Sequence, residues 1–285
     1  MNVASVSFAA LFGTALLAGV FLTTAGCSSD DAAAPSASTS TADAGVRHGG
    51  SVTLRYASGQ LSMSAVFVAQ SATAASTSCT STTDGACKTT DCVLGAGYDA
   101  SVSFDSSDSA GTLTFRGGAL PDAASLPYAT DHYGYQAIGV LAAPWKENDA
   151  ITIAASGDTV PAFQTVLNAP ALTATLTSPV LGASTPAAVD RSTDLALQWS
   201  GVTGGQMVWL LQVSSSTRLV DTICSFDGAK GTASVPATVL AKFPAVTATA
   251  IMLPTTVQDV TAGAYTIGLS IQGTATNGTG SVELR

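Results

Sequence analysis

Residues 194–200 read Asp-Leu-Ala-Leu-Gln-Trp-Ser, and this short stretch decides the fold class. Leu195, Leu197 and Trp199 alternate with small or polar residues, so the three side chains share one face of an extended chain. A β-strand with one buried face has this period of two, whereas an amphipathic helix has a period near 3.6. The stretch therefore predicts a β-strand that packs one face against a core.

The same alternation recurs on both sides of this strand, and Gly, Asp and Ser clusters separate the repeats. The predicted strands before it are 52–56, 61–67, 100–104, 112–115, 135–141, 151–155, 163–167 and 172–176, and those after it are 207–213, 219–226, 248–253, 264–271 and 281–284. Residues 235–243 are typical of a strand end that passes into one or two helical turns. Asn277-Gly278 is a hairpin turn signal. Short strands at this spacing predict an all-β protein of antiparallel sandwiches.

Composition supports this fold class and excludes several functions. The chain has 285 residues, 46% of them hydrophobic, which is enough to fill packed cores. It has 10 Lys and Arg residues against 19 Asp and Glu, for a net charge of −9. The basic residues are scattered singly, so no patch tracks phosphates and nucleic acid is not an expected partner.

The first 46 residues differ from the rest and predict an export signal with a tether. Residues 1–26 carry no ionised side chain, and the apolar run 8–22 has the length of a signal-peptide core. Thr24-Ala25-Gly26-Cys27 follows, and it resembles the lipobox of bacterial lipoproteins. That resemblance implies a signal peptide over 1–26, lipidation of Cys27 and, from Ser28, sorting to the outer membrane. Residues 27–46 form the expected tether. The alternatives are an ordinary cleaved signal and an uncleaved anchor.

We expect two β-sandwich modules after the tether, at 47–177 and 194–285, joined by a linker at 178–193 that contains two prolines. The second module resembles a fibronectin type III or related immunoglobulin-like domain. Trp199 matches the second-strand tryptophan of that family, and 261–269 matches its turn followed by a tyrosine strand. The resemblance implies that Tyr265 is a corner tyrosine bonded to the main chain. Many unrelated exported proteins share this fold, so it does not by itself imply a function.

Four cysteines remain once Cys27 is lipidated, and export makes disulfides plausible. Three of them lie in 71–98, a long polar stretch that we expect to be a loop held by disulfides. Cys224 lies in a predicted strand and is either a buried free thiol or the partner of a loop cysteine, which would clamp the modules together. Three pairings are open. The candidate disulfide cysteines are Cys79, Cys87, Cys92 and Cys224.

No catalytic motif occurs in the sequence. There is no G-x-S-x-G, H-E-x-x-H, P-loop or G-x-G-x-x-G, and no C-x-x-C pair with a nearby histidine that would hold zinc. We therefore predict no metal and no cofactor. His132 is the one histidine beyond the tether region that could serve as a general base.

The most unusual segment is 126–135, which holds half of the tyrosines. Aromatic rings beside Asp and His suit stacking on a sugar or a protein hot spot. The candidate binding residues are Tyr128, Asp131, His132, Tyr133, Tyr135 and Trp145. The alternative is structural: Tyr133 and Tyr135 point into the core while Tyr128 covers its rim.

These features together predict an envelope lipoprotein, facing the periplasm or the surface. Its folded part is expected to be a non-catalytic module that binds a glycan or an envelope protein, or is structural. The alternatives are an exported hydrolase that uses His132 with an Asp, and a carbohydrate-binding module that uses 128–135. The membrane, through the N-terminal lipid, is the expected partner.

Overall fold

The computed structural model describes residues 47–70, 78–94, 107–122, 124–129, 132–134, 136–182 and 184–285. Regular structure in these residues is nearly all strand, which confirms the all-β prediction. The predicted signal peptide 1–26, the lipid site Cys27, the tether 27–46 and the predicted strand 100–104 lie outside the described residues. No helix in the described part of the chain is long and apolar enough to cross a membrane.

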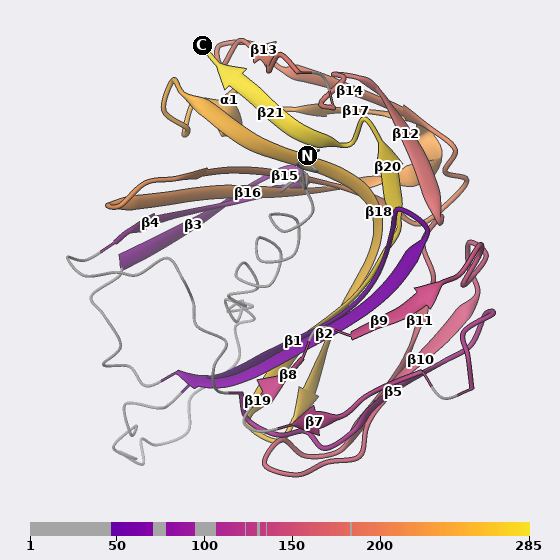
Figure 1. Cartoon of the computed structure of the whole chain (residues 1–285). Coiled ribbons are helices and arrows are strands. Elements are labelled where there is room, and N and C mark those ends of the chain that lie inside the picture. Colours follow the sequence, from indigo (N-terminus) through magenta and orange to yellow (C-terminus); the bar gives the residue numbers. More distant parts are fainter. Residues whose placement is uncertain are drawn as a thin grey trace, which may run out of the picture.

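The largest sheet has eleven strands and runs through the whole fold (Figure 1). Its main path is β3 (Ser78–Asp84), β4 (Cys87–Val93), β16 (Arg218–Asp227), β15 (Gln206–Ser214), β18 (Thr247–Ala262), β19 (Tyr265–Gln272), β1 (Arg47–Ala57), β2 (Gln60–Gln70) and β9 (Gln136–Val140), while β21 (Thr279–Leu284) pairs with β18 and β13 (Ala187–Val189) pairs with β21. Two smaller sheets pack on its two halves and enclose two separate hydrophobic cores.

The first module is a sandwich around the first core. Its second sheet consists of β11 (Phe163–Asn168), β10 (Ala150–Ala155), β5 (Leu113–Arg116) and β6 (Ser125–Leu126), and a short hairpin of β7 (Tyr128–Ala129) and β8 (His132–Tyr133) lies beside it. Alternate residues of both sheets point inward, as the period-2 pattern predicts. Phe67 from β2, Phe115 from β5 and Ile153 from β10 have no solvent-exposed area.

The second module is a sandwich around the second core. Its smaller sheet has the order β17 (Thr232–Val235), β14 (Leu195–Ser200), β12 (Thr173–Ser178) and β20 (Thr274–Thr276). It faces the part of the large sheet formed by β16, β15, β18 and β21. In β14 the residues Leu197 and Trp199 are buried and Leu195 is half-buried, which confirms the predicted alternation of buried and exposed side chains. The Trp199 indole nitrogen donates to the Gly228 carbonyl at 2.7 Å.

The helical insertion in the second module is also confirmed. A 3-10 turn, η2 (Gly228–Lys230), precedes β17, and α1 (Ala237–Leu240) follows Pro236. Proline at the helix start costs no hydrogen bond, because the first N–H groups of a helix have no partner within it. Val239 and Leu240 are buried in the second core, so the insertion closes one end of the sandwich.

β18 belongs to both modules. Along its 16 residues it pairs first with β21 and β15, over 247–255, and then with β19, over 255–262. Ala250 and Met252 from its first half lie in the second core, and Ala262 at its end lies in the first. Figure 1 shows it as one long curved ribbon that runs from one module into the other.

The two cores therefore do not follow the predicted domain boundaries residue by residue. β1 pairs in parallel with β19 from His48 opposite Tyr265 to Arg55 opposite Gln272, so the C-terminal residues 262–271 complete the first core. Cys87 from the first half of the chain lies in the second core. Residues 178–193, predicted as a linker, contribute buried side chains to the second core and the strand β13.

Two sequence-based expectations about turns need correction. Tyr265 does not bond to the main chain of the sandwich: its hydroxyl donates to Asp108 Oδ2 at 2.7 Å, inside the first module. The reason is that 261–269 forms the tip and return strand of the β18–β19 hairpin, which has left the second module. Asn277 has the expected positive φ of 58°, but β20 and β21 on either side of it lie in different sheets, so its turn connects two sheets and is not a hairpin.

We predict that Ile267→Ala on β19 destabilises the fold by about 2–5 kcal/mol, because it leaves a cavity in the first core. Val257→Ala on the paired strand β18 is the control, since Val257 is 38% exposed and its truncation is expected to cost less than about 0.5 kcal/mol. Urea unfolding measures both. Equal stability of the two variants would contradict a role for the C-terminal hairpin in the first core.

Candidate functional site

The structure separates the six predicted binding residues. Tyr133 and Trp145 are buried in the first core. The Tyr133 hydroxyl accepts from the Ala110 backbone N–H and donates to the Gly111 carbonyl, both at 2.7 Å. These two rings hold the core together and do not offer a face to a ligand.

Tyr128 and His132 lie at the edge of the same core. The Tyr128 ring is half-buried and meets the Tyr133 ring edge-on at 5.1 Å, and its hydroxyl donates to the Ser107 carbonyl at 2.6 Å. His132 is exposed on β8. This placement of Tyr128 and Tyr133 agrees with the structural alternative, in which the segment covers and fills a core.

The remaining two candidates, Asp131 and Tyr135, lie outside the described residues. The hydrolase hypothesis requires a carboxylate beside His132, and Asp131 is its neighbour in sequence, so that hypothesis stays a prediction. Within the described ranges no group of three His, Cys, Asp or Glu side chains is placed to hold a metal ion.

All four cysteines after Cys27 are paired. Cys79 bonds to Cys92, and Cys87 bonds to Cys224. Of the two alternatives for Cys224, the disulfide is therefore the one observed. Each bond joins residues that stand directly opposite each other on neighbouring strands: Cys79 on β3 to Cys92 on β4, and Cys87 on β4 to Cys224 on β16.

The disulfides reveal a hairpin where a loop was predicted. Residues 78–93 of the expected loop 71–98 form β3 and β4, and β4 adds to the edge of β16. The strands turn at Gly85-Ala86, where Gly85 has a φ of 56° that a side chain would strain. We call this unit the cystine hairpin. It extends the second module's sheet by two strands.

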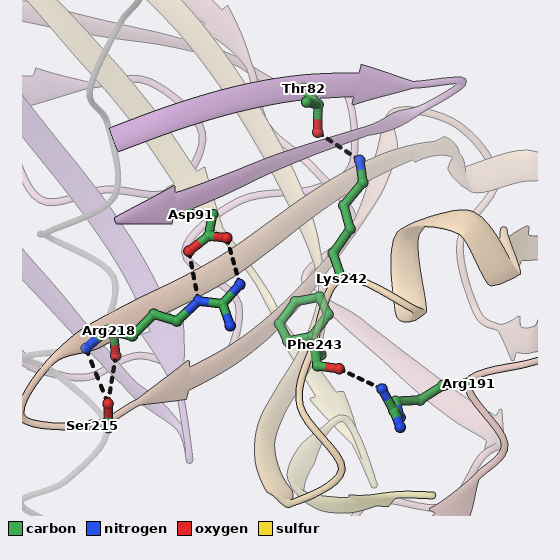
Figure 2. Close-up of polar contacts among 7 residues, drawn as sticks. All are labelled: Thr82, Asp91, Arg191, Ser215, Arg218, Lys242 and Phe243. Carbon is green, nitrogen blue, oxygen red and sulfur yellow. Dashed lines mark hydrogen bonds and ion pairs between the residues drawn. The ribbon is translucent and has the colours of Figure 1, made fainter. Parts of the chain in front are cut away.

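Side chains from the second module also hold the cystine hairpin (Figure 2). The Lys242 ammonium donates to the Thr82 hydroxyl at 2.5 Å. The Thr238 hydroxyl donates to the Asp84 carboxylate. Both donors lie in or just after α1, so the helical insertion contacts the outer strand β3. The hairpin is thus fixed at its turn as well as along its inner strand.

An ion pair fixes the other end of the cystine hairpin. The Arg218 guanidinium on β16 donates two parallel hydrogen bonds to Asp91 on β4, at 2.8 and 2.6 Å (Figure 2). The hydrogen bond from Arg218 lowers the pKa of the Asp91 carboxyl. Because both side chains are partly exposed, the pair contributes little to stability and acts mainly on alignment.

A buried carboxylate lies on the opposite face of the same sheet. Asp221 on β16 is 3% exposed, and burial raises its pKa to about 6, with Lys88 on β4 acting in the other direction. It stands between Gln212 on β15 and Thr90 on β4 in the strand register. Ionisation of Asp221 at neutral pH therefore opposes folding.

A surface hollow in the described part of the chain is a poor candidate for a ligand site. One hollow of about 210 Å³ lies between residues 181–186 and the start of β21, lined by Ser and Gly residues among others. Pockets that enclose small ligands are typically larger, about 300–1,000 Å³, and more apolar. The most distinctive constructed feature in the described residues is the cystine hairpin.

Comparisons with known proteins identify no family. No protein-family model matches the sequence, and no curated protein matches it. One solved chain, described under "Structural insight into host cell surface retention of a 1.5-MDa bacterial ice-binding adhesin", is similar with 8% identity and a TM-score of 0.16. The match covers 81% of this chain and 65% of that one, so this chain spans a little under two thirds of its length.

We predict that the two disulfides contribute unequally to stability. Cys87–Cys224 closes a loop of 137 residues and Cys79–Cys92 one of 13, and the longer loop loses more freedom in the unfolded chain. Replacing the first pair by alanine should cost about 4–5 kcal/mol, and replacing the second about 3 kcal/mol. Urea unfolding of the two double variants measures the difference. A larger loss from the shorter loop would contradict this account.

We also predict that Asp221→Asn stabilises the protein at high pH. The folded-state pKa of Asp221 lies above the unfolded value, so stability is complete below about pH 4 and falls as the pH rises through about 6. At pH 8 the variant should be more stable by up to about 3 kcal/mol, and at pH 3.5 the two proteins should unfold alike. Thermal unfolding across this range tests it. A variant that is no more stable at pH 8 would rule out the burial cost.

Proposed function

We propose that this chain is a lipid-anchored envelope protein whose folded part is a non-catalytic binding or structural module. The observation that carries the proposal is the pair of cross-strand disulfides in a chain that begins with a lipobox-like signal. Disulfides persist in oxidising compartments, so the folded part belongs to an extracellular or periplasmic protein. The lipid anchor is the further step, and it rests on Thr24-Ala25-Gly26-Cys27.

The anchor and the tether explain the division of the chain. A diacylated and amide-acylated Cys27 would hold the protein stably, because two chains suffice for lasting membrane attachment. Residues 28–46 are rich in Ser, Ala, Thr and Asp and contain no aromatic residue, a composition typical of a flexible spacer. The modules would then stand away from the bilayer, in the periplasm or at the surface.

A non-catalytic role agrees with where the candidate residues lie. Two of the rings proposed for ligand stacking, Tyr133 and Trp145, are core residues with their polar atoms bonded inside the protein. The most distinctive features of the fold hold its parts together. One strand is common to two sandwiches, and a hairpin is held by two disulfides, an ion pair and side-chain hydrogen bonds. Such rigidity suits a scaffold or a binding surface.

We further propose that the second module is of the immunoglobulin or fibronectin III type. Its smaller sheet holds β12, β14 and β17, which correspond to the first, second and fifth strands of an immunoglobulin-like domain. Its other sheet holds β15, β18 and β21, which correspond to the third, sixth and seventh. The β18–β19 excursion is then an insertion between the last two strands. The corner tyrosine is missing from this correspondence.

The anchor is tested by mass spectrometry of the N-terminal peptide of the full chain, isolated from bacterial membranes. We expect cleavage before Cys27 and acyl groups on that residue, and we expect Cys27→Ala to lose both the lipid and the membrane attachment. Ser29→Ala is the matched control and should keep them. An unmodified N-terminus beyond Cys27 would exclude the lipoprotein proposal.

A further inference from the structure

The outer strand of the cystine hairpin ends the large sheet with an open edge. Among the described residues β3 pairs with β4 alone, in unbroken register over its seven residues, and the side chains of 79–83 are exposed. Proteins commonly protect such edges with a bulge, a proline or a lysine. β3 has none of these, whereas β9 at the other end of the sheet pairs through a register shift between Leu61 and Ser62.

The disulfide identifies which backbone groups of β3 face outward. The Cα atoms of Cys79 and Cys92 are 4.0 Å apart, which is the spacing of a pair that exchanges no backbone hydrogen bonds. Bonded and non-bonded pairs alternate along an antiparallel ladder. The N–H and C=O groups of Cys79, Ser81 and Thr83 therefore point away from β4, toward the open edge.

These outward groups are complementary to themselves. If a second β3 lies antiparallel to the first with Ser81 opposite Ser81, Cys79 falls opposite Thr83 on both sides. Each of these three residue pairs is then a bonded pair that exchanges two hydrogen bonds, about six in all, and no outward group between 79 and 83 is left without a partner. In this register Ser81 stands opposite Ser81 and Thr80 opposite Thr82, and such hydroxyl pairs are favourable cross-strand neighbours.

Charge near this edge does not oppose the pairing. The chain as a whole has a net charge of −9. On and beside the cystine hairpin, however, the three carboxylates Asp84, Asp91 and Asp221 are balanced by Lys88, Arg218 and Lys242. In the symmetric register Asp84, the one charged residue of β3, meets position 78 of the other copy and not a second carboxylate.

We propose that β3 pairs with β3 of a second copy of this chain, antiparallel about Ser81, so that two large sheets join edge to edge. The strand is fixed in advance by its disulfide and by the Lys242 and Thr238 contacts, so pairing orders little additional chain. The contact area between the two strands is small, so the pairing needs a high local concentration of the chain. The inference therefore rests on the proposed lipid anchor, which confines both copies to one membrane.

The test is oxidative cross-linking of the full-length Ser81→Cys variant in bacterial membranes. The new thiols would stand directly opposite each other, at a separation that a disulfide spans. Val166→Cys is the matched control, because Val166 is an exposed residue on β11, an edge strand of the other sheet. We expect linkage between two copies at position 81 at least tenfold faster than at position 166, confirmed by mass spectrometry of the joined peptides.

The outcomes separate the possible failures. Equal rates at the two positions would overturn the pairing, and linkage of position 81 to a different protein would replace the second copy by a foreign strand. The N-terminal peptide from the same sample shows whether Cys27 carries lipid. Equal rates with a lipidated Cys27 overturn the pairing, whereas an unmodified Cys27 overturns the proposed anchor.

A second pair of variants tests the backbone bonds themselves. Ser81→Pro removes an outward N–H without removing a bond to β4, and proline is tolerated on edge strands. Co-purification of two differently tagged full-length copies should fall severalfold with Ser81→Pro and persist with Ser81→Ala. Intact Cys79–Cys92 and Cys87–Cys224 disulfides in both variants show that each is folded. Equal co-purification would overturn the pairing.

Discussion

The structure depends on the continuity of β18. A strand that changes partners half-way along its length must satisfy two ladders and two cores at once, and β18 does so by pairing with β15 and β21 in its first half and with β19 in its second. The hairpin that it makes with β19 then offers an edge to β1. The first module is therefore completed by residues from the far end of the chain, and neither core can form in full before the C-terminal third has been made. Contacts of such long range are slow to form but, once made, couple the two halves.

The local pattern was sufficient to predict the elements, because burial of one sheet face leaves an alternating record in the sequence. Leu197 and Trp199 point into the second core as expected, and most predicted strands occur within a few residues of their expected bounds. The helical turn after Pro236 was predictable for the same reason, since proline and small apolar residues act locally. For Cys224 a disulfide and a free thiol were both open. Only the fold decides between them, because the spacing of cysteines in the sequence does not reveal strand pairing across 137 residues.

Long-range pairing explains what the sequence could not show. The sequence of β1 does not show whether it pairs with a strand in its own half of the chain or with β19. The two strands pair in parallel, so no short turn between them marks the pairing. The sequence around Tyr265 is equally suited to a sandwich strand and to a hairpin tip, and the choice of hairpin moved that hydroxyl to Asp108. The cystine hairpin did have a local signal, which is Gly85 at the first central position of its two-residue turn. That signal was obscured because Ser and Thr replace the apolar residues of a usual strand. The burial of Tyr133 and Trp145 was not predictable for a related reason, since their spacing in the sequence does not tell a core ring from a binding ring.

A strand composed of hydroxyl residues is unusual as an outermost strand, and its attachments indicate why it is kept in place. Isolated two-stranded hairpins are marginally stable in water, and this one has no apolar face of its own apart from its cystines. The Cys79–Cys92 disulfide ties its two strands together, and the Cys87–Cys224 disulfide, the Asp91–Arg218 ion pair and the contacts from α1 hold it from outside. The cystine hairpin is held at both ends. A loop would be enough to cover the edge of β16, so these attachments do more than cover that edge. They are what is needed to hold a row of backbone donors and acceptors straight and facing outward. A function at this edge is therefore favoured by the number of contacts that hold β3 in place.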